Sequence, residues 1–211
     1  MRVLDCGPAA LLVEFAGTDA RAAAAVHAWL ARARADLPRA VTDLVPGART
    51  VLVCFDPAAS TPPALRTWAT GLGTTEGDTA AAAPEAEPLL IEVDYDGEDL
   101  AAAAEALEMT PAELVAAHTA TLWRCDFTGF APGFGYLRGA GWERDVPRLA
   151  TPRTRVPAGA VGLAGPYTGV YPRATAGGWR LIGRASAVLW DDRADPPALI
   201  RPGRAVRFVA R

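Results

Sequence analysis

The sequence contains no lysine, no asparagine and no glutamine, so all 21 of its basic side chains are arginines. Without lysine, the chain cannot carry out Schiff-base chemistry and cannot form the phosphate-binding loop GxxxxGK[ST]. Without side-chain amides, it has no asparagine or glutamine donor for an oxyanion. Its 2 histidines, His27 and His118, are too few for a metal site built on several histidines, and we expect no metal.

Long apolar runs, cysteine pairs and a strong net charge are also missing. The apolar stretches are broken by charged residues and fall short of the roughly 20 residues that span a bilayer. Asp5 and Glu14 interrupt the segment where a signal peptide needs an apolar core, so we expect a cytoplasmic protein without membrane contact. A net charge of −3 gives no general attraction to nucleic acid. Cys6, Cys54 and Cys125 suggest neither a disulfide framework nor a metal site.

The apolar pattern predicts an α+β protein with two domains. Residues 1–70 form a small α+β domain, residues 71–88 are small, polar and rich in proline and glycine and predict a linker, and residues 89–211 form the second domain. The elements expected in the first domain are strands at 11–15, 41–45 and 50–55, a helix at 19–34 capped by Asp19, and a helix at 62–68.

The second domain is predicted to be a β-barrel or sandwich behind two short helices. The stretch TPAE is a capping box in which Thr110 caps the helix, Pro111 takes its first position and Glu113 reaches back. Many short strands with frequent turn signals follow. The expected elements are helices at 97–108 and 111–118 and strands at 89–95, 121–125, 135–137, 153–156, 160–164, 169–171, 179–182, 187–190 and 205–209.

The stretch FTGFAPGFGYLRG, residues 127–139, is an apolar loop that turns sharply. Pro132 and Gly133 fit the middle of a type II turn, where proline presets φ and glycine takes the positive φ. Exposed backbone amides in such a loop can bind an anion. The alternative is a buried corner of the barrel with Phe127, Phe130 and Phe134 in the core.

Three further features offer candidate chemistry. Arg153 and Arg155 in TPRTRVPAG are two apart in an extended segment, so both can face a carboxylate or phosphate, or they can protect an edge strand. Residues 168–184 predict a hairpin with the Tyr171 hydroxyl and Arg184 near its ends. His118 is either a packed, hydrogen-bonded helix residue or a general base.

Four motifs, GFAPGFGYL, TPRTRVPAG, TGVYP and GGWRLIGR, resemble in order and spacing the family of the B subunit of the bacterial ATP-dependent 5-oxoprolinase. That family includes KipI-type sporulation kinase inhibitors and the first-subunit domain of allophanate hydrolase and urea carboxylase. The segments ALLVEF and VPGARTVLVCFDP fit as well, so the resemblance covers nearly the whole chain. One departure is Gly135, where the family pattern GFxPGFPYL has proline.

The resemblance implies a cyclophilin-like β-barrel for residues 89–211 and a complex with homologues of the A and C subunits of 5-oxoprolinase. It implies the reaction of 5-oxo-L-proline, ATP and water to give L-glutamate, ADP and phosphate, with ATP bound at the level of the complex and the chain inactive alone. Two other functions of the family are a KipI-type inhibitor that docks on a histidine kinase and a carboxyltransferase-like component with a biotin-linked carboxyl group as ligand.

The chemistry of these motifs gives the expected site. Arginines would hold the substrate carboxylate or a phosphoryl oxygen, and loop amides would stabilise charge on the lactam oxygen. The predicted catalytic residues are His118, Arg153, Arg155 and Tyr171, and the predicted substrate-binding residues are Phe130, Pro132, Gly133, Phe134, Thr168 and Arg184.

Overall fold

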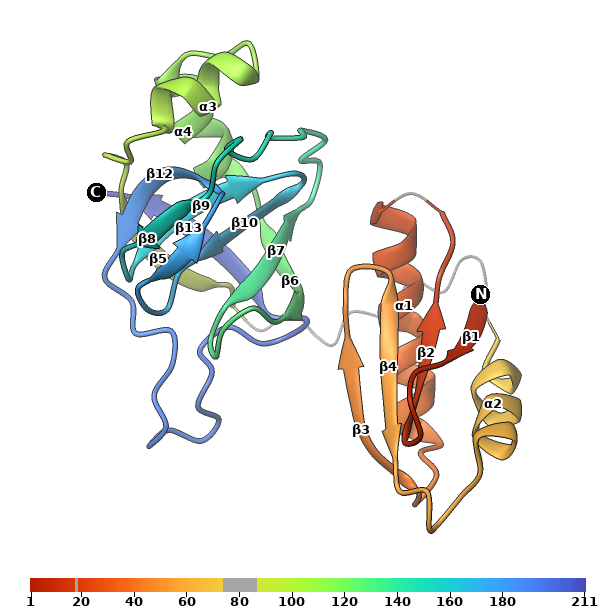
Figure 1. Cartoon of the computed structure of the whole chain (residues 1–211). Helices are drawn as coiled ribbons and strands as arrows, with labels where there is room; N and C mark the ends of the chain where they lie inside the picture. Colours follow the sequence, from red (N-terminus) through yellow and green to blue (C-terminus); the bar gives the residue numbers. More distant parts are fainter. Residues whose placement is uncertain (18, 74–86) are drawn as a thin grey trace. The chain divides into compact units, whose positions relative to one another are not determined.

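The computed structural model describes residues 1–17, 19–73 and 87–211, without the side chains of residues 19 and 20 (Figure 1). The chain divides into two compact units, Met1–Pro84 and Glu85–Arg211. Their boundary falls within the predicted linker, residues 71–88. Most of that linker and the predicted capping side chain of Asp19 lie outside the described residues, so both stay predictions.

The N-terminal unit is a four-stranded antiparallel sheet in the order β1-β2-β4-β3 with two helices on one face. Alternate residues of β2 and β4, such as Leu11 and Val53, are buried and pack on α1 and α2, as period-2 alternation requires. Its elements are β1 (Arg2–Asp5), β2 (Ala10–Glu14), α1 (Asp19–Ala35), β3 (Val41–Pro46), β4 (Thr50–Phe55) and α2 (Pro62–Gly71). The predicted strands and helices are confirmed, and β1 was missed because its side chains are mostly exposed.

The C-terminal unit is a closed barrel in the order β10-β7-β6-β13-β5-β12-β9 (Figure 1). Neighbouring strands pair antiparallel except β13 and β5, which run parallel. The predicted α+β class and barrel are confirmed. Its elements are β5 (Leu89–Asp94), α3 (Leu100–Ala106), α4 (Pro111–Ala120), β6 (Trp123–Thr128), β7 (Gly135–Gly139), β8 (Arg153–Val156), β9 (Ala160–Ala164), β10 (Tyr167–Val170), β11 (Thr175–Gly177), β12 (Arg180–Ala185) and β13 (Ala205–Ala210).

The helices α3 and α4 show how local and tertiary signals compete. The capping box at α4 is confirmed, since Thr110 Oγ1 accepts a hydrogen bond from the Glu113 amide at 3.2 Å and the Glu113 carboxylate accepts one from the Thr110 amide at 2.7 Å. The predicted start of α3 at residue 97 is wrong. Gly97 lies against β12, where a Cβ would stand 2.3 Å from the Leu181 carbonyl oxygen, and its amide donates to the Ile182 carbonyl at 3.3 Å.

Two strand predictions near the end of the chain are wrong. The predicted hairpin at 168–184 does not form, because β10 and β12 each pair with β9, which lies between them. The chain leaves the barrel after β10, and β11 pairs with β8 in a separate two-stranded sheet before the chain returns as β12. Residues 187–190 form no strand beyond an isolated bridge between Trp190 and Ala198. None of the described helices is long and apolar enough to cross a membrane.

Candidate functional site

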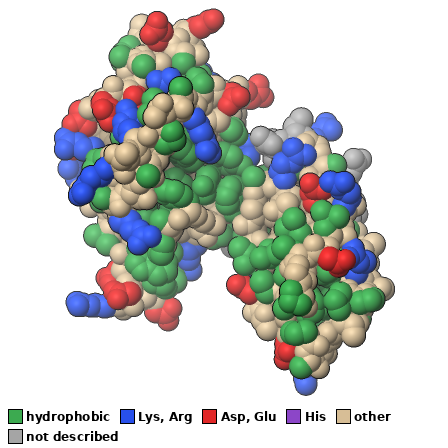
Figure 2. Space-filling view, in the orientation of Figure 1, with side chains coloured by type: hydrophobic (Ala, Val, Ile, Leu, Met, Phe, Trp, Pro, Cys, Tyr) green, Lys and Arg blue, Asp and Glu red, His purple; other side chains and the backbone are tan. Residues whose placement is uncertain are grey.

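The outer surface of the barrel carries a continuous group of aromatic side chains. Strand alternation sends Leu137 and Thr168 inward and Tyr136 and Tyr167 outward, so a second apolar cluster forms outside the barrel core. Figure 2 shows hydrophobic side chains gathered over β6 and β7 beside arginines. We call this group the aromatic face; its rings contact one another with centroids 4.3 to 6.5 Å apart, and its members are Phe127, Phe130, Phe134, Tyr136, Tyr167, Tyr171 and Trp179.

Two glycines let these rings lie directly on the strands. Gly162 of β9 and Gly169 of β10 stand opposite each other in register. A Cβ on Gly169 would lie 3.0 Å from the Phe134 ring and 3.2 Å from the Trp179 ring, and one on Gly162 would lie 3.1 Å from Trp179 Cβ. Any larger residue would therefore push the rings away from the barrel wall.

The predicted type II turn is confirmed at residues 131–134. The Phe134 amide donates to the Ala131 carbonyl at 3.0 Å, and Gly133 has φ +83°. Gly133 packs against the 187–200 segment, since a Cβ there would lie 2.9 Å from the Leu189 carbonyl oxygen. Phe134 is buried, whereas Phe130 is 56% exposed and has φ +69°. The buried-corner alternative is therefore confirmed for Phe134 and wrong for Phe130, which faces solvent.

The loop amides are less available than the sequence suggested. The amide of Ala131 donates to the Gly129 carbonyl at 2.8 Å, and the Gly129 amide donates to the Phe134 carbonyl at 3.2 Å. Together with the turn hydrogen bond, these contacts occupy three backbone donors within the loop. Fewer loop amides therefore remain for an anion than the sequence suggested.

Gly135 stands where the resembling family has proline. A Cβ at this position would lie 2.6 Å from Ile200 Cγ2 and 3.2 Å from Cys125 Sγ. The side chain of Ile200 occupies the space that a larger residue 135 would need. The glycine that replaces the family's proline at position 135 therefore fits the packing of Ile200.

Arg153 is held in a structural ion pair. Its Nε lies 2.8 Å from Glu98 Oε1 and its Nη2 lies 2.8 Å from Asp99 Oδ1. The other Asp99 oxygen accepts a hydrogen bond from the Leu181 amide at 2.7 Å. This arrangement ties β8 to the start of α3 and to β12, so we assign Arg153 a positioning role in place of the predicted catalytic one.

The other predicted arginines do not gather beside it. Arg155 is exposed, although it is two residues from the half-buried Arg153 on the same strand. Arg184 forms an exposed ion pair with Asp96, and a hydrogen bond from Arg184 lowers the pKa of the Asp96 carboxyl.

His118 and Thr168 lie inside the barrel, and both are fully buried. The Thr168 hydroxyl donates to the Gly162 carbonyl at 3.1 Å, so it accepts from His118 Nε2, which lies 2.9 Å away. His118 Nδ1 then accepts from the Tyr95 hydroxyl at 2.7 Å. Burial lowers the pKa of His118 to about 3, which keeps the ring neutral. We therefore assign His118 and Thr168 structural roles, as in the packed-histidine alternative.

Tyr171 belongs to the aromatic face but is covered. It is 1% exposed, and a Cβ on Gly177 would stand 2.5 Å from its hydroxyl oxygen. Burial raises the pKa of Tyr171, and a hydrogen bond from the Trp179 backbone lowers it in part. Its hydroxyl supports the β11 region and is not an open contact for a substrate.

Sequence reasoning missed a buried ion pair at one side of the aromatic face. Arg138 Nε donates to Asp126 Oδ2 at 2.6 Å, and its guanidinium carbon lies 4.6 Å from the centroid of the Tyr167 ring. Tyr136 and Arg138 are two apart in GYLRG and share one face of β7. The same spacing argument that selected Arg153 and Arg155 could have selected this pair.

Arg148 was also missed, because it lies in a segment without regular structure. The backbone on both sides of it is held in place: the Leu149 amide donates to the Gly178 carbonyl at 2.8 Å, and Arg180 Nε donates to the Pro147 carbonyl at 3.2 Å. Burial raises the pKa of Tyr136 and of Tyr171, and the nearby positive charge of Arg148 lowers both in part. The backbone that carries this exposed arginine is thus held against Gly178 and Arg180, on either side of Trp179 of the aromatic face.

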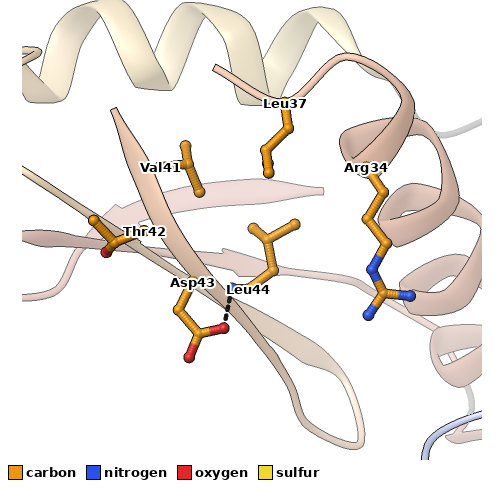
Figure 3. A pocket seen from close by; sticks show the side chains of 6 residues that line it. All are labelled: Arg34, Leu37, Val41, Thr42, Asp43 and Leu44. Carbon is orange, nitrogen blue, oxygen red and sulfur yellow. Dashed lines mark hydrogen bonds between the residues drawn. The ribbon is translucent and has the colours of Figure 1, made fainter. Parts of the chain in front are cut away.

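The N-terminal unit contains a pocket of about 210 Å³ beside β3 and the end of α1 (Figure 3). The Asp43 carboxylate accepts a hydrogen bond from the Leu44 amide at 2.7 Å. Arg34 and Asp43 contribute opposite charges, so the lining has no net charge that would select an ionic ligand. Its lining residues are Arg34, Leu37, Val41, Thr42, Asp43 and Leu44.

Two relatives of this chain are named as the B subunit of 5-oxoprolinase. The B subunit of 5-oxoprolinase from Escherichia coli O157:H7 is 44% identical over 135 residues, which are 63% of this chain and 62% of that protein. The B subunit of 5-oxoprolinase from Bacillus subtilis (strain 168) is 43% identical over 122 residues, 56% of this chain and 51% of that protein. The matched parts therefore span between half and two thirds of these relatives.

Solved structures agree with the fold. A crystal structure of TTHA0988 superposes with a TM-score of 0.78 at 30% identity over 96% of this chain and 40% of that chain. The Kluyveromyces lactis urea carboxylase superposes with a TM-score of 0.75 at 15% identity over 99% of this chain and 21% of that chain, which supports the fold alone. Residues 1–200 match the family described as carboxyltransferase domain, subdomain C and D. The resemblance drawn from the four motifs is confirmed, and the chain belongs to this carboxyltransferase-domain family.

Proposed function

We propose that the chain is the B component of an ATP-dependent 5-oxoprolinase complex, which converts 5-oxo-L-proline, ATP and water to L-glutamate, ADP and phosphate. The observation that carries this proposal is the 44% and 43% identity to two proteins named as the B subunit of 5-oxoprolinase. The aromatic face supports it, because the exposed ring of Phe130 and the arginines of this surface suit a small, flat acid.

The proposed substrate surface is the outer wall of the barrel around the 131–134 turn. Phe130 offers an exposed ring to the lactam, and the buried Phe134 and Tyr171 hold that ring in place with centroids 5.3 and 6.1 Å away. Pro132 and Gly133 shape the turn. Arg155, exposed on β8, stays a proposed ligand for a carboxylate or phosphoryl oxygen.

ATP is proposed to act at the level of the complex. An unstrained lactam resists direct hydrolysis, and activation of its carbonyl by ATP makes the carbon–nitrogen bond easier to break. The chain has no lysine for a standard phosphate-binding loop, and three amides of the apolar loop are occupied. We therefore propose that a partner protein holds the nucleotide and that this chain is inactive alone.

Homologues of the A and C subunits of 5-oxoprolinase are the proposed partners, in the cytoplasm. Exposed apolar side chains support an assembly, since Phe130 is 56% exposed, Trp190 is 42% exposed and Val188 is 70% exposed. The backbone contact between Gly133 and Leu189 holds the turn that follows Phe130 against the segment that contains Val188 and Trp190.

The test is co-expression of the chain with the homologues of the A and C subunits from its own organism. We expect a stable complex that releases glutamate from 5-oxo-L-proline only when ATP is present. The matched control is the same preparation without this chain, which should release none. A stable complex of all three proteins without ATP-dependent glutamate release would contradict the proposal.

A second candidate is carboxyl transfer, which the family description favours. In that function the same surface would accept a carboxyl group carried on biotin. The two candidates separate in one preparation, because carboxyl transfer requires a biotinylated partner and glutamate release does not.

A further inference from the structure

Arg148 is positioned by backbone contacts from three directions. Val146 forms a bridge with Gly165, its amide donating to the Gly165 carbonyl at 3.0 Å. Arg180 holds the carbonyl of residue 147 at 3.2 Å, and the Gly178 carbonyl holds the amide of residue 149 at 2.8 Å. A long exposed side chain on such a fixed backbone loses less conformational entropy on binding than one on a free loop.

Arg148 is one of the exposed arginines that stay available to a ligand. Arg153 is bound by Glu98 and Asp99, and Arg138 is bound by Asp126. Among the described residues, no carboxylate forms an ion pair with Arg148. The residues on either side of Arg148 are bonded to Gly178 and Arg180, which flank Trp179, and the Trp179 ring lies 5.5 Å from the Tyr136 ring. In agreement with this placement, the positive charge of Arg148 lowers the pKa of both Tyr136 and Tyr171 in part.

Tyr136 supplies the second polar group. Its side chain is half-buried, its ring stacks on Phe127 with a centroid distance of 4.3 Å, and no hydrogen bond joins its hydroxyl to another residue that the structure describes. Tyr171 differs, because its hydroxyl lies beneath Gly177. The Tyr136 hydroxyl and the Arg148 guanidinium can each donate a hydrogen bond to the same carboxylate.

We propose that Arg148 and the Tyr136 hydroxyl bind the carboxylate of a small acid whose flat ring lies against Phe130 and the neighbouring aromatic side chains. This inference rests on the proposed function, in which that acid is 5-oxo-L-proline. A nucleoside triphosphate is a poorer fit, because it needs several cations or a nest of free amides. Three of the loop amides are occupied, and Arg138 and Arg153 are already bound by carboxylates.

The first test measures binding to the full-length chain without its partners. Saturation-transfer NMR compares 5-oxo-L-proline with its carboxamide, which keeps the ring and loses the charge. We expect transfer to the ring protons of the acid, little transfer to the amide, and loss of the signal in Arg148→Ala. Arg173→Ala is the matched control, since Arg173 is exposed between β10 and β11 and forms no hydrogen bond or ion pair with another described residue.

The second test uses the reconstituted complex. Arg148→Ala should raise the KM for 5-oxo-L-proline by about 10- to 100-fold, and Tyr136→Phe should raise it by about 3- to 10-fold. The KM for ATP should stay within about twofold of the unaltered complex in both variants. Circular dichroism and thermal unfolding check that each variant is folded.

The outcomes separate this inference from the proposed function. An active complex in which Arg148→Ala behaves like Arg173→Ala overturns the carboxylate site and leaves the proposed function standing. An inactive complex with binding that depends on both Arg148 and the carboxylate overturns the proposed function and supports the site. Equal transfer to the acid and its amide also overturns the site, because the carboxylate then contributes nothing.

Discussion

Along β10, Thr168 faces the interior of the barrel and Tyr167 faces out. The polar groups on these two sides differ in whether they have hydrogen-bond partners. Inside, His118, Tyr95 and Thr168 form a chain in which each of these groups has a hydrogen-bond partner. Outside, the Tyr167 hydroxyl accepts a hydrogen bond from Arg138, whereas the Tyr136 hydroxyl and the Arg148 guanidinium have no hydrogen-bond or ion-pair partner among the described residues. Satisfied buried groups specify the fold, whereas unsatisfied exposed groups are free to bind a ligand. The difference separates structural from functional candidates better than residue type does.

The largest expected effect tests the interior with acid. The folded protein holds the pKa of His118 at about 3, below the value of 6.5 expected without burial. Between these values the unfolded chain binds a proton that the folded chain excludes. The free energy of unfolding should therefore fall as the pH falls, by about 1.4 kcal/mol per pH unit from this group.

His118→Leu is the matched variant for that measurement. Urea unfolding between neutral pH and about pH 4 should show lower stability at neutral pH and a shallower slope than in the unaltered chain. The carboxyl groups of Asp96 and Glu113 also have lowered pKa values, so they too make the folded protein less stable in acid. Both residues are present in both proteins, so their contributions cancel when the two slopes are subtracted. If the free energy of unfolding had the same slope against pH in both proteins, His118 would not be the group that takes up a proton on unfolding.

A second contrast concerns two arginines that the sequence placed in one site. Arg153 pairs with an Asp99 side chain that is 10% exposed, so Arg153→Ala leaves a buried carboxylate and should lower the free energy of unfolding by about 2 to 3 kcal/mol. Arg184 and Asp96 are 62% and 49% exposed, so solvent screens their attraction and Arg184→Ala should lower the free energy of unfolding much less than Arg153→Ala does. Similar losses in chemical denaturation would remove the distinction between the two pairs.

The smallest expected effects come from removing one tyrosine hydroxyl inside the barrel and one on its outer surface. Tyr95→Phe takes away the donor to His118 Nδ1 and should lower stability by about 1 to 2 kcal/mol. Tyr136→Phe removes a hydroxyl without a partner among the described residues and should change stability by less than about 0.5 kcal/mol. A larger loss in Tyr136→Phe would mean that its hydroxyl serves the fold.

Local chemistry made much of the fold predictable. The capping box at Thr110, the turn at Pro132 and Gly133 and the strands β8 and β9 depend on neighbours in sequence, and all were found. The wrong hairpin has the opposite cause. Whether β10 pairs with β12 or β9 depends on closure of the barrel, which no short window of sequence encodes.

The site was less predictable for the same reason. Arg153 looked free because its partners, Glu98 and Asp99, lie more than 50 residues earlier in the chain. Arg148 looked unremarkable because its position comes from contacts with Gly178 and Arg180, not from a motif. Residue type suggested arginines as ligands for an acid, and the tertiary contacts show which of them already have carboxylate partners.

Phe130 adopts a left-handed backbone conformation, φ +69°, that disfavours a bulky side chain, and it does so while 56% exposed. A glycine at this position would relieve about 1 kcal/mol of strain and remove little buried surface. Phe130→Gly should therefore make the protein harder to unfold and, under the proposed function, raise the KM of the complex for its substrate. Stability and activity would then move in opposite directions at one residue, a trade-off that selection for folding alone would not maintain.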